Sequence, residues 1–227
     1  MIELDRVSHR LGERPVLRDI TLTLAERRVG IIGANGSGKS TLARTFNGLV
    51  SPDEGEVRAG GLDPRRQQRE VRRAVGFMFT DASAQILMPT VAEDVALSLR
   101  DLPISAQEKE TRLRETLDFF GLADHADQPA QLLSSGQKQL LAFAGVLVRR
   151  PEILVCDEPS TLLDLANVLR LQRTLAELPQ QVVLLTHHLE LLDDFDRVVV
   201  LDEGRVVADD APAPAVAEYR RLMGVRA

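Results

Sequence analysis

Four continuous runs of apolar residues recur along the chain at long intervals. They cover residues 28–33, 74–79, 152–157 and 181–186. A strand that is apolar at nearly every position is buried on both faces, which is typical of a parallel sheet covered by helices. Helical stretches at residues 39–49 and 137–148 fall between these runs. The pattern therefore predicts an α/β fold, with a mostly parallel sheet flanked by helices.

Alternating apolar and polar positions mark the two ends of the chain. Residues 2–7 and 20–24 alternate as half-buried strands do, and residues 197–208 indicate a hairpin that turns at Glu203 and Gly204. After the hairpin, two prolines precede a short amphipathic helix that we expect over residues 214–223. These segments predict antiparallel strands and a final helix in addition to the parallel sheet.

Signals for helix starts concentrate in the middle of the chain. Thr90 with Glu93, and Ser105 with Glu108, fit the capping box, in which a hydroxyl and a carboxylate each satisfy a backbone amide. The second of these helices is expected to stop at Gly121, which suits a left-handed cap. Residues 85–145 are therefore expected to be mainly helical and inserted into the α/β frame.

Composition narrows the class of protein. Of the 227 residues, 44% are hydrophobic, so the chain can bury a substantial core. No apolar run reaches the roughly 18 residues that a membrane helix needs, and the first residues do not resemble a secretory signal. The single cysteine, Cys156, cannot form an internal disulfide, which favours the reducing cytosol. A net charge of −6 argues against a broad nucleic-acid surface.

The strongest single motif follows the first apolar run. Residues 33–41 match the phosphate-binding pattern G-x-x-x-x-G-K-[ST], between a strand and a helix. Backbone amides exposed by the glycines, and the partial positive charge of the helix N-terminus, bind phosphate. We expect Lys39 to reach the β- and γ-phosphates and Ser40 to offer its hydroxyl to Mg²⁺. The expected nucleotide-binding residues of this P-loop are Gly33, Asn35, Gly36, Ser37, Gly38, Lys39, Ser40 and Thr41.

A later apolar strand ends in two acids, Asp157 and Glu158. Taken alone, a strand that ends in acids is common. After a P-loop it fits a Walker B element, in which Asp157 would hold Mg²⁺ and Glu158 would polarise the attacking water. Cys156, inside this strand, is best explained as a small buried apolar residue.

The segment Leu133-Ser134-Ser135-Gly136-Gln137 lies between these two motifs. It resembles the signature motif, usually LSGGQ, of ATP-binding cassette (ABC) ATPases, with Ser135 in place of one glycine. Two further matches follow in the family's order. Residues 160–164 resemble the D-loop, which ends here at Asp164, and His187 resembles the switch histidine at the end of the next strand. The resemblance to ABC ATPases covers nearly the whole chain.

For that family, the resemblance implies a single ABC ATPase domain over residues 1–227, with the fold of a P-loop nucleoside triphosphatase. Residues 1–84 and 146–227 would form a RecA-like core with an antiparallel β subdomain, and residues 85–145 a helical signature subdomain. It also implies that ATP and Mg²⁺ bind and that the chain hydrolyses ATP, with Glu158 as the base and His187 at the γ-phosphate.

The resemblance further implies a head-to-tail dimer with a second ATPase, identical or different. Each ATP would lie between the P-loop of one protomer and the signature motif of the other. The signature residues expected to contact this second ATP are Ser134, Ser135, Gly136 and Gln137.

Residues 75–79 and 85–97 are similar to the Q-loop region of energy-coupling-factor (ECF) importers. This similarity implies a peripheral ATPase on the cytoplasmic face of the cell membrane, with a transmembrane coupling subunit and a substrate-capture membrane protein as partners. Overall resemblance favours biotin as the imported micronutrient, with cobalt or nickel next. A soluble ABC ATPase that acts on nucleic acid or ribosomes is the alternative from another class. The sequence has no coiled-coil insertion, second cassette or basic face to support it, so no nucleic-acid partner is expected.

The apolar residues Ile86, Leu87 and Met88 follow the Q-loop. The family docks on its membrane subunits through a groove in this region, around residues 85–94, so the resemblance implies that these side chains face a partner. The alternative is that all three are simply core residues. Sequence alone leaves both interpretations open.

Two positions depart from the family's pattern. Leu11 takes the place of the aromatic residue that stacks on adenine, or His9 does if the register shifts by two. Thr80 replaces the Q-loop glutamine, which in the family reaches Mg²⁺ and the attacking water. We favour Thr80 acting through a bridging water over Gln85, because five residues of extended loop span roughly 15 Å.

Overall fold

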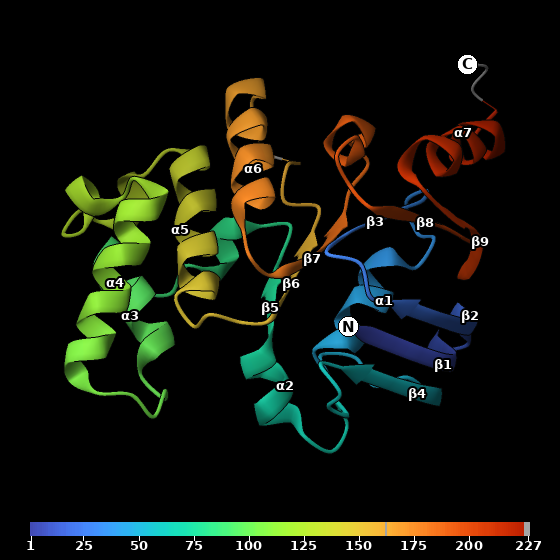
Figure 1. The fold of residues 1–227 in the computed structure, drawn as a ribbon, viewed down its shortest axis with the longest axis horizontal. Helices are drawn as coiled ribbons and strands as arrows, with labels where there is room; N and C mark the ends of the chain where they lie inside the picture. The colour runs from blue at the N-terminus through green and yellow to red at the C-terminus, as the bar shows by residue number, and fades with distance from the viewer. Residues whose placement is uncertain (162, 225–227) are drawn as a thin grey trace. The chain divides into compact units, whose positions relative to one another are not determined.

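The computed structural model describes residues 1–161 and 163–224, which form two compact units (Figure 1). The first unit comprises Met1–Phe77, Glu152–Glu158 and the residues from Glu177 onward, and the second comprises Met78–Pro151 and Pro159–Ala176. The segment predicted to be helical, residues 85–145, falls inside the second unit. The division into a core and two subdomains stays a prediction.

A six-stranded sheet forms the centre of the first unit. Its strand order is β5-β6-β7-β3-β8-β9, with β3 (Arg28–Ile32), β5 (Val75–Met78), β6 (Ile153–Asp157), β7 (Gln181–Leu185), β8 (Arg197–Asp202) and β9 (Arg205–Asp210). β3 pairs in parallel with both β7 and β8, and β6 pairs in parallel with β7. Every residue of β3 and of β6 is buried. The predicted parallel sheet, with strands that are apolar throughout, is thus confirmed.

A separate antiparallel sheet of three strands belongs to the same unit. Its order is β2-β1-β4, from β1 (Ile2–Leu11), β2 (Arg14–Leu24) and β4 (Glu54–Ala59). The first two strands are longer than predicted because they continue to a tight turn at Gly12, where φ is 61°. β8 and β9 form the predicted hairpin, and its turn residues Glu203 and Gly204 both have positive φ, at 43° and 78°. Positive φ at both central residues is what a two-residue hairpin turn with the correct twist requires.

Three α-helices and one short 3₁₀ helix complete the described part of the first unit. They are α1 (Lys39–Phe46), α2 (Gln68–Ala74), η4 (Leu189–Leu192) and α7 (Pro212–Leu222). α1 ends before the predicted limit because Gly48 takes a φ of 72°, which a helix does not use. α7 begins two residues before the predicted start, since proline fits the first turn of a helix, where its missing N–H costs nothing.

The second unit is helical. It contains α3 (Val91–Leu99), α4 (Ala106–Phe120), α5 (Ser135–Leu147) and most of α6 (Leu165–Glu177), with the short 3₁₀ helices η1 (Ala82–Gln85), η2 (Ala123–His125) and η3 (Ala130–Leu132). α5 packs against α3 and α4, and the rings of Phe120 and Phe143 stack with centroids 6.4 Å apart. These contacts bury the core of the unit.

Of the two predicted capping boxes, one is complete and the other is half formed. Thr90 and Glu93 exchange both hydrogen bonds at the start of α3. At α4, Ser105 accepts from the Glu108 amide at 3.1 Å, but the Glu108 carboxylate accepts instead from Arg112, at 3.1 and 2.6 Å. Gly121 ends α4 with a φ of 65°, as predicted.

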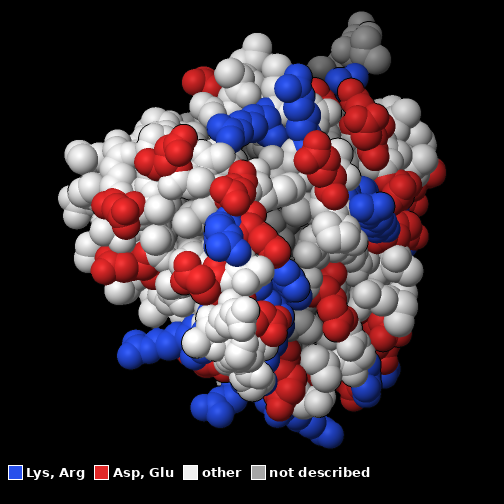
Figure 2. Space-filling model, turned by 60° about the vertical axis from the view of Figure 1, so that its left-hand side comes forward, with Lys and Arg blue, Asp and Glu red and all other residues white. Residues whose placement is uncertain are grey.

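Within residues 1–161 and 163–224, no helix combines the length and the apolar character needed to cross a membrane. Charge on the face drawn in Figure 2 is mixed, because Asp and Glu side chains lie among those of Lys and Arg.

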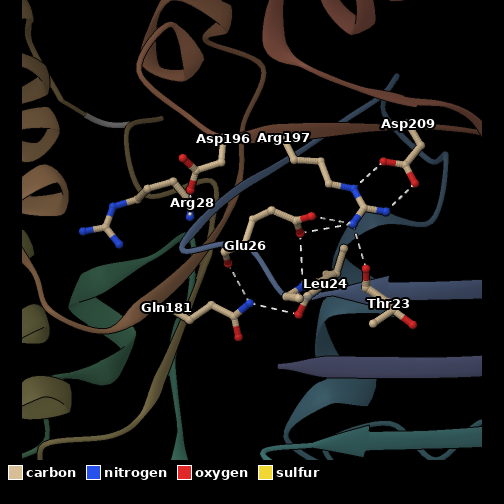
Figure 3. A network of polar contacts seen from close by, with 9 residues as sticks. Thr23, Leu24, Glu26, Arg28, Gln181, Asp196, Arg197 and Asp209 are labelled. Atoms are coloured by element: carbon tan, nitrogen blue, oxygen red, sulfur yellow. Dashed lines mark hydrogen bonds and ion pairs between the residues drawn. The ribbon is translucent and has the colours of Figure 1, made fainter.

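Arg197, at the start of β8, anchors the hairpin to the rest of the first unit (Figure 3). Its guanidinium donates to both carboxylate oxygens of Asp209 at 2.6 Å, and to Glu26 at 3.1 Å and the Thr23 carbonyl at 2.8 Å. The hydrogen bonds with Asp209 raise the pKa of Arg197, so the side chain stays charged. Gln181 of β7 also donates to the Glu26 carbonyl, at 2.8 Å. One cation thus joins β8, β9, the end of β2 and the turn before β3.

We expect Arg197→Met to lower the free energy of unfolding by about 2 kcal/mol, because Asp209 and Glu26 lose their shared cation while still partly buried. Urea denaturation measures this change. Arg205→Met is the matched control: Arg205 is exposed on β9 and has no side-chain partner in the part of the chain described, so a change within about 0.5 kcal/mol is expected. Equal losses in the two variants would show that the network adds nothing.

Candidate nucleotide-binding site

The P-loop connects β3 to α1, and its backbone passes close to neighbouring strands. A side chain at Gly33 would meet the Leu201 carbonyl oxygen at 2.1 Å, and one at Gly38 would meet the Val16 carbonyl oxygen at 2.7 Å. Gly38 also takes a φ of 106° as the N-cap of α1. Only glycine satisfies both conditions, so the loop can run directly into the helix. The N-terminus of α1 then presents backbone amides, as an anion site requires.

Lys39 is buried beside this loop, with 7% of its surface exposed. Its ammonium donates to the carbonyls of Gly33 at 2.7 Å and Ala34 at 3.2 Å. Burial lowers the pKa of Lys39, and the nearby carboxylates of Glu158 and Asp157 oppose that shift. The cation is therefore held at the mouth of the loop, as its predicted role in binding phosphate requires.

Ser40 and Asp157 meet directly. The Ser40 hydroxyl donates to Oδ1 of Asp157 at 2.8 Å, and Asp157, at the end of β6, is 1% exposed. Burial raises the pKa of this carboxyl, whereas the hydrogen bond from Ser40 and the charge of Arg44 lower it. A hydroxyl and one carboxylate are hard oxygen donors that suit Mg²⁺, which takes one or two carboxylates together with substrate phosphates. The described residues hold no cluster of three or more His, Cys, Asp or Glu that would form an all-protein metal site.

Glu158 and His187 form a second polar pair at the ends of their strands. Oε2 of Glu158 accepts from the His187 ring at 2.7 Å and from the His187 amide at 3.2 Å. Glu158 also takes a φ of 54°, a conformation that costs a non-glycine residue energy. The ring of the neighbouring His188 contacts Glu190 at 3.1 Å instead.

One cavity of about 260 Å³ gathers most of the predicted nucleotide-binding residues of the first unit. Its lining is Leu11, Arg14, Val16, Asn35, Gly36, Gly38, Lys39, Ser40, Thr41 and Glu158. Leu11 is 60% exposed and lines the cavity, whereas His9 pairs with Leu17 inside the sheet and does not line it. Of the two residues considered for the adenine-stacking position, Leu11 is therefore the one that reaches the cavity. Sequence reasoning missed Arg14 and Val16. Arg14 lies opposite Leu11 in the hairpin, a pairing that could have revealed it.

The signature motif lies in the second unit, at the start of α5. Ser134 is the N-cap of α5. Its hydroxyl oxygen accepts from the Gln137 amide at 3.3 Å, and its own amide donates to the Gln137 side-chain oxygen at 2.9 Å. Ser135 is exposed at the first helical position, where a side chain is tolerated. Gly136 is different, because a Cβ there would lie 2.3 Å from the Asn167 side-chain oxygen. Ser135 thus replaces the glycine at the position where the fold tolerates a side chain, whereas Gly136 occupies the position where it does not.

The D-loop residue Asp164 also lies in the second unit, just before α6. Its Oδ1 accepts from the backbone and side-chain nitrogens of Asn167, both at 2.9 Å. Asn167, which sequence reasoning missed, therefore bonds to Asp164 and fills the space beside Gly136 where a side chain would otherwise lie. Leu162 of the predicted D-loop segment falls outside the described residues.

Thr80 and Gln85 both belong to the second unit, and the loop between them is not extended as expected. Asp81 caps the short helix η1 by accepting from the Ser83 and Ala84 amides at 2.9 and 3.3 Å. This compact turn brings Oε1 of Gln85 to 2.9 Å from the Phe79 amide. The length of an extended loop between Thr80 and Gln85 therefore cannot be the reason to prefer Thr80 over Gln85 as the Q-loop residue. A better reason is that the Gln85 oxygen already accepts a backbone hydrogen bond.

A P-loop that follows one buried strand, with acids at the end of another, defines a P-loop nucleoside triphosphatase. Residues 17–161 match the family model described as ABC transporter, and the chain belongs to that family. It is an ATPase that uses ATP and Mg²⁺.

Several known proteins resemble the chain over almost its whole length. A Deinococcus radiodurans protein, provisionally named as an ABC transporter ATP-binding protein, is 51% identical over 98% of this chain and 99% of its own. The biotin transport ATP-binding protein BioM of Rhizobium etli is 40% identical over 97% of this chain and 98% of its own. Among solved structures, cbiO1 of Clostridium perfringens, part of the ABC transporter complex cbiONQ, has a TM-score of 0.86 at 28% identity, covering 98% of this chain and 93% of that one.

We expect Glu158→Gln to reduce steady-state ATP hydrolysis at least about 100-fold, the usual effect of removing a general base. ATP should still bind and hold the dimer closed. Lys39→Ala should instead weaken nucleotide binding itself. Phosphate release and binding of a fluorescent ATP analogue measure the two effects, and near-normal turnover in Glu158→Gln would refute the assignment of the base.

We expect weak selectivity for the base of the nucleotide. Leu11 offers adenine an apolar contact without the aromatic stacking that is worth on the order of 1 kcal/mol, or roughly fivefold in affinity. GTP should therefore be hydrolysed within about tenfold of ATP, and Leu11→Phe should tighten ATP binding about fivefold. A preference for ATP of several hundredfold in the wild type would mean that another residue recognises the base.

Proposed function

We propose that this ABC ATPase is the energy-coupling subunit of an ECF-type importer. It would sit peripherally on the cytoplasmic face of the membrane, with a transmembrane coupling subunit and a substrate-capture membrane protein. The observation that carries this proposal is an exposed groove in the second unit with adjacent apolar side chains, at the place where the Q-loop region resembles that of ECF ATPases.

The groove has a volume of about 350 Å³. Its lining is Ser83, Ile86, Leu87, Met88, Pro89, Ala130, Gln131 and Lys138. Leu87 is 72% exposed, and neither Ile86 nor Met88 is buried, so the interpretation of these three residues as core is wrong. Adjacent exposed apolar side chains among polar ones are found at protein–protein contacts, which have an apolar centre and a polar rim.

The backbone under these side chains is fixed. Asp94 of α3 is 6% exposed, and its Oδ1 accepts from the amides of Leu87 and Met88 at 2.7 and 2.9 Å. On the other side, the Ala130 amide donates to the Pro89 carbonyl at 2.9 Å. Apolar side chains presented on a fixed backbone lose little entropy on binding, which favours docking.

In the proposed mechanism, the P-loop amides and Lys39 hold the phosphates, and Glu158 accepts a proton from the water that attacks the γ-phosphate. The His187 ring and amide keep the Glu158 carboxylate in place. Ser40 and Asp157 would hold Mg²⁺, which neutralises phosphate charge when bound. We keep Thr80 as the Q-loop residue that acts on this site through a water.

Biotin is the substrate we propose, because the Rhizobium etli relative is named for biotin transport and matches the chain end to end. Cobalt is the next choice, since a Syntrophus aciditrophicus relative, 36% identical over 91% of this chain and 76% of its own, is named for cobalt import. A second ATPase copy completes the proposed assembly and supplies its own signature motif to the ATP bound here.

We expect Leu87→Asp to reduce recovery of the transmembrane coupling subunit with the tagged ATPase at least about tenfold, as loss of an interface anchor does. Thermal unfolding should not change, because the side chain is exposed. Val207→Asp, at a 42% exposed position on β9, is the matched control and should leave the complex intact. Full recovery of the complex with Leu87→Asp would overturn the docking proposal.

A further inference from the structure

The His125 ring, at the end of η2, lies between two glutamine side chains of the second unit. Its Nδ1 is 2.6 Å from Oε1 of Gln128, and its Nε2 is 3.1 Å from Nε2 of Gln137. Gln137 belongs to the signature motif, whereas His125 and Gln128 belong to no motif in the sequence. The ring is half-buried, as is the Gln137 side chain.

The hydrogen-bond partners determine which ring nitrogen carries the proton. Oε1 of Gln137 already accepts from the Ser134 amide at 2.9 Å, so the group that faces His125 is the Gln137 NH₂, a donor. Nε2 of His125 must therefore accept. Nδ1 then carries the proton and donates to Oε1 of Gln128. Only the neutral Nδ1–H tautomer satisfies every member of this chain.

This chain of hydrogen bonds does more than cap a helix. The capping bond already favours one orientation of the Gln137 amide, because the flipped amide would set its NH₂ group against the Ser134 N–H, a second donor. A histidine that accepts from the Gln137 nitrogen disfavours the flipped amide a second time, because the flip would also leave two acceptors facing each other. His125 therefore reinforces the amide orientation that keeps Ser134 at the helix start.

The segment that carries His125 is itself held in place. The Ala92 amide donates to the Ala126 carbonyl at 2.9 Å, and the Val91 amide to the Gln128 carbonyl at 3.2 Å. His125 is thus fixed against the start of α3 on one side and against the signature motif on the other.

From these contacts we infer that His125, as the Nδ1–H tautomer, is a positioning residue for ATP hydrolysis. It locks the Gln137 amide and so orients Ser134, Ser135 and the N-terminus of α5 toward the nucleotide held by a second copy of the chain. The inference rests on the proposed role of the signature motif, but its first test does not.

The first test is the tautomer itself. Two-bond ¹H–¹⁵N correlation spectra of the full chain distinguish Nδ1–H from the Nε2–H form that is more common in water. The chain has four histidines, and the missing signal in His125→Gln assigns the ring. We expect Nδ1–H in the wild type. In Gln137→Glu a carboxylate oxygen replaces the donor, so the proton should move to Nε2 or the ring should become doubly protonated. An Nε2–H ring in the wild type would overturn the inference.

The second test compares two replacements that each keep one half of the ring's contacts. In His125→Gln the side-chain oxygen can still accept from Gln137, whereas in His125→Asn the side-chain nitrogen can still donate only toward Gln128. Loss of one positioning hydrogen bond is expected to lower kcat about fivefold in His125→Asn and His125→Ala. His125→Gln should stay within about twofold of the wild type.

KM for ATP should change little in all three variants, because the P-loop residues lie in the first unit. Thermal unfolding identifies any variant that does not fold, and the tautomer test still stands in that case because its main result comes from the wild type. Equal kcat values for His125→Gln and His125→Asn would refute a positioning role. Recovery of the membrane subunits measures the proposed transport function separately, so failure of that function and failure of this inference have different outcomes.

Discussion

The parallel pairing of β3, β7 and β6 is the constraint on which the site depends. Ile31 pairs with Leu185, and Leu185 pairs with Asp157, so these three residues form one row across the sheet. The chain beyond that row must supply the chemistry: the P-loop follows β3, Glu158 follows β6 and His187 follows β7. Because these strands are almost entirely buried, the polar groups of the site lie at or just beyond their carboxyl ends, as Asp157 does at the last position of β6. The contacts of Ser40 with Asp157 and of Glu158 with His187 follow from this common edge.

Features fixed by short-range pattern were predictable from the sequence. The buried strands, the P-loop and the Thr90 capping box each depend on residues within a few positions of one another. α2 had no such signal, because Val71 is its only buried residue. α6 did carry a short-range signal, since Val168, Leu171 and Leu175 recur at helical spacing, although no helix was predicted there.

Features that depend on competition or on distant contacts were not predictable. The Ser105 capping box is incomplete because Arg112, one turn further on, takes the Glu108 carboxylate. The loop from Thr80 to Gln85 folds into a turn because Asp81 caps it. An estimate of the loop's length that assumes an extended chain does not include that cap. His125 reaches Gln137 across twelve positions of sequence through a tertiary contact that no spacing rule describes.

The buried carboxylate of Asp94 fixes the backbone of the groove independently of the side chains that line it. It holds the main-chain amides of Leu87 and Met88, not their side chains, so the path of the backbone does not depend on which residues occupy those positions. Residues 86–88 are therefore open to exchange, whereas loss of Asp94 would release two amides together. If this groove is the docking surface proposed above, a graft of three side chains would change which membrane subunit the ATPase recognises and would leave its hydrolytic residues unchanged.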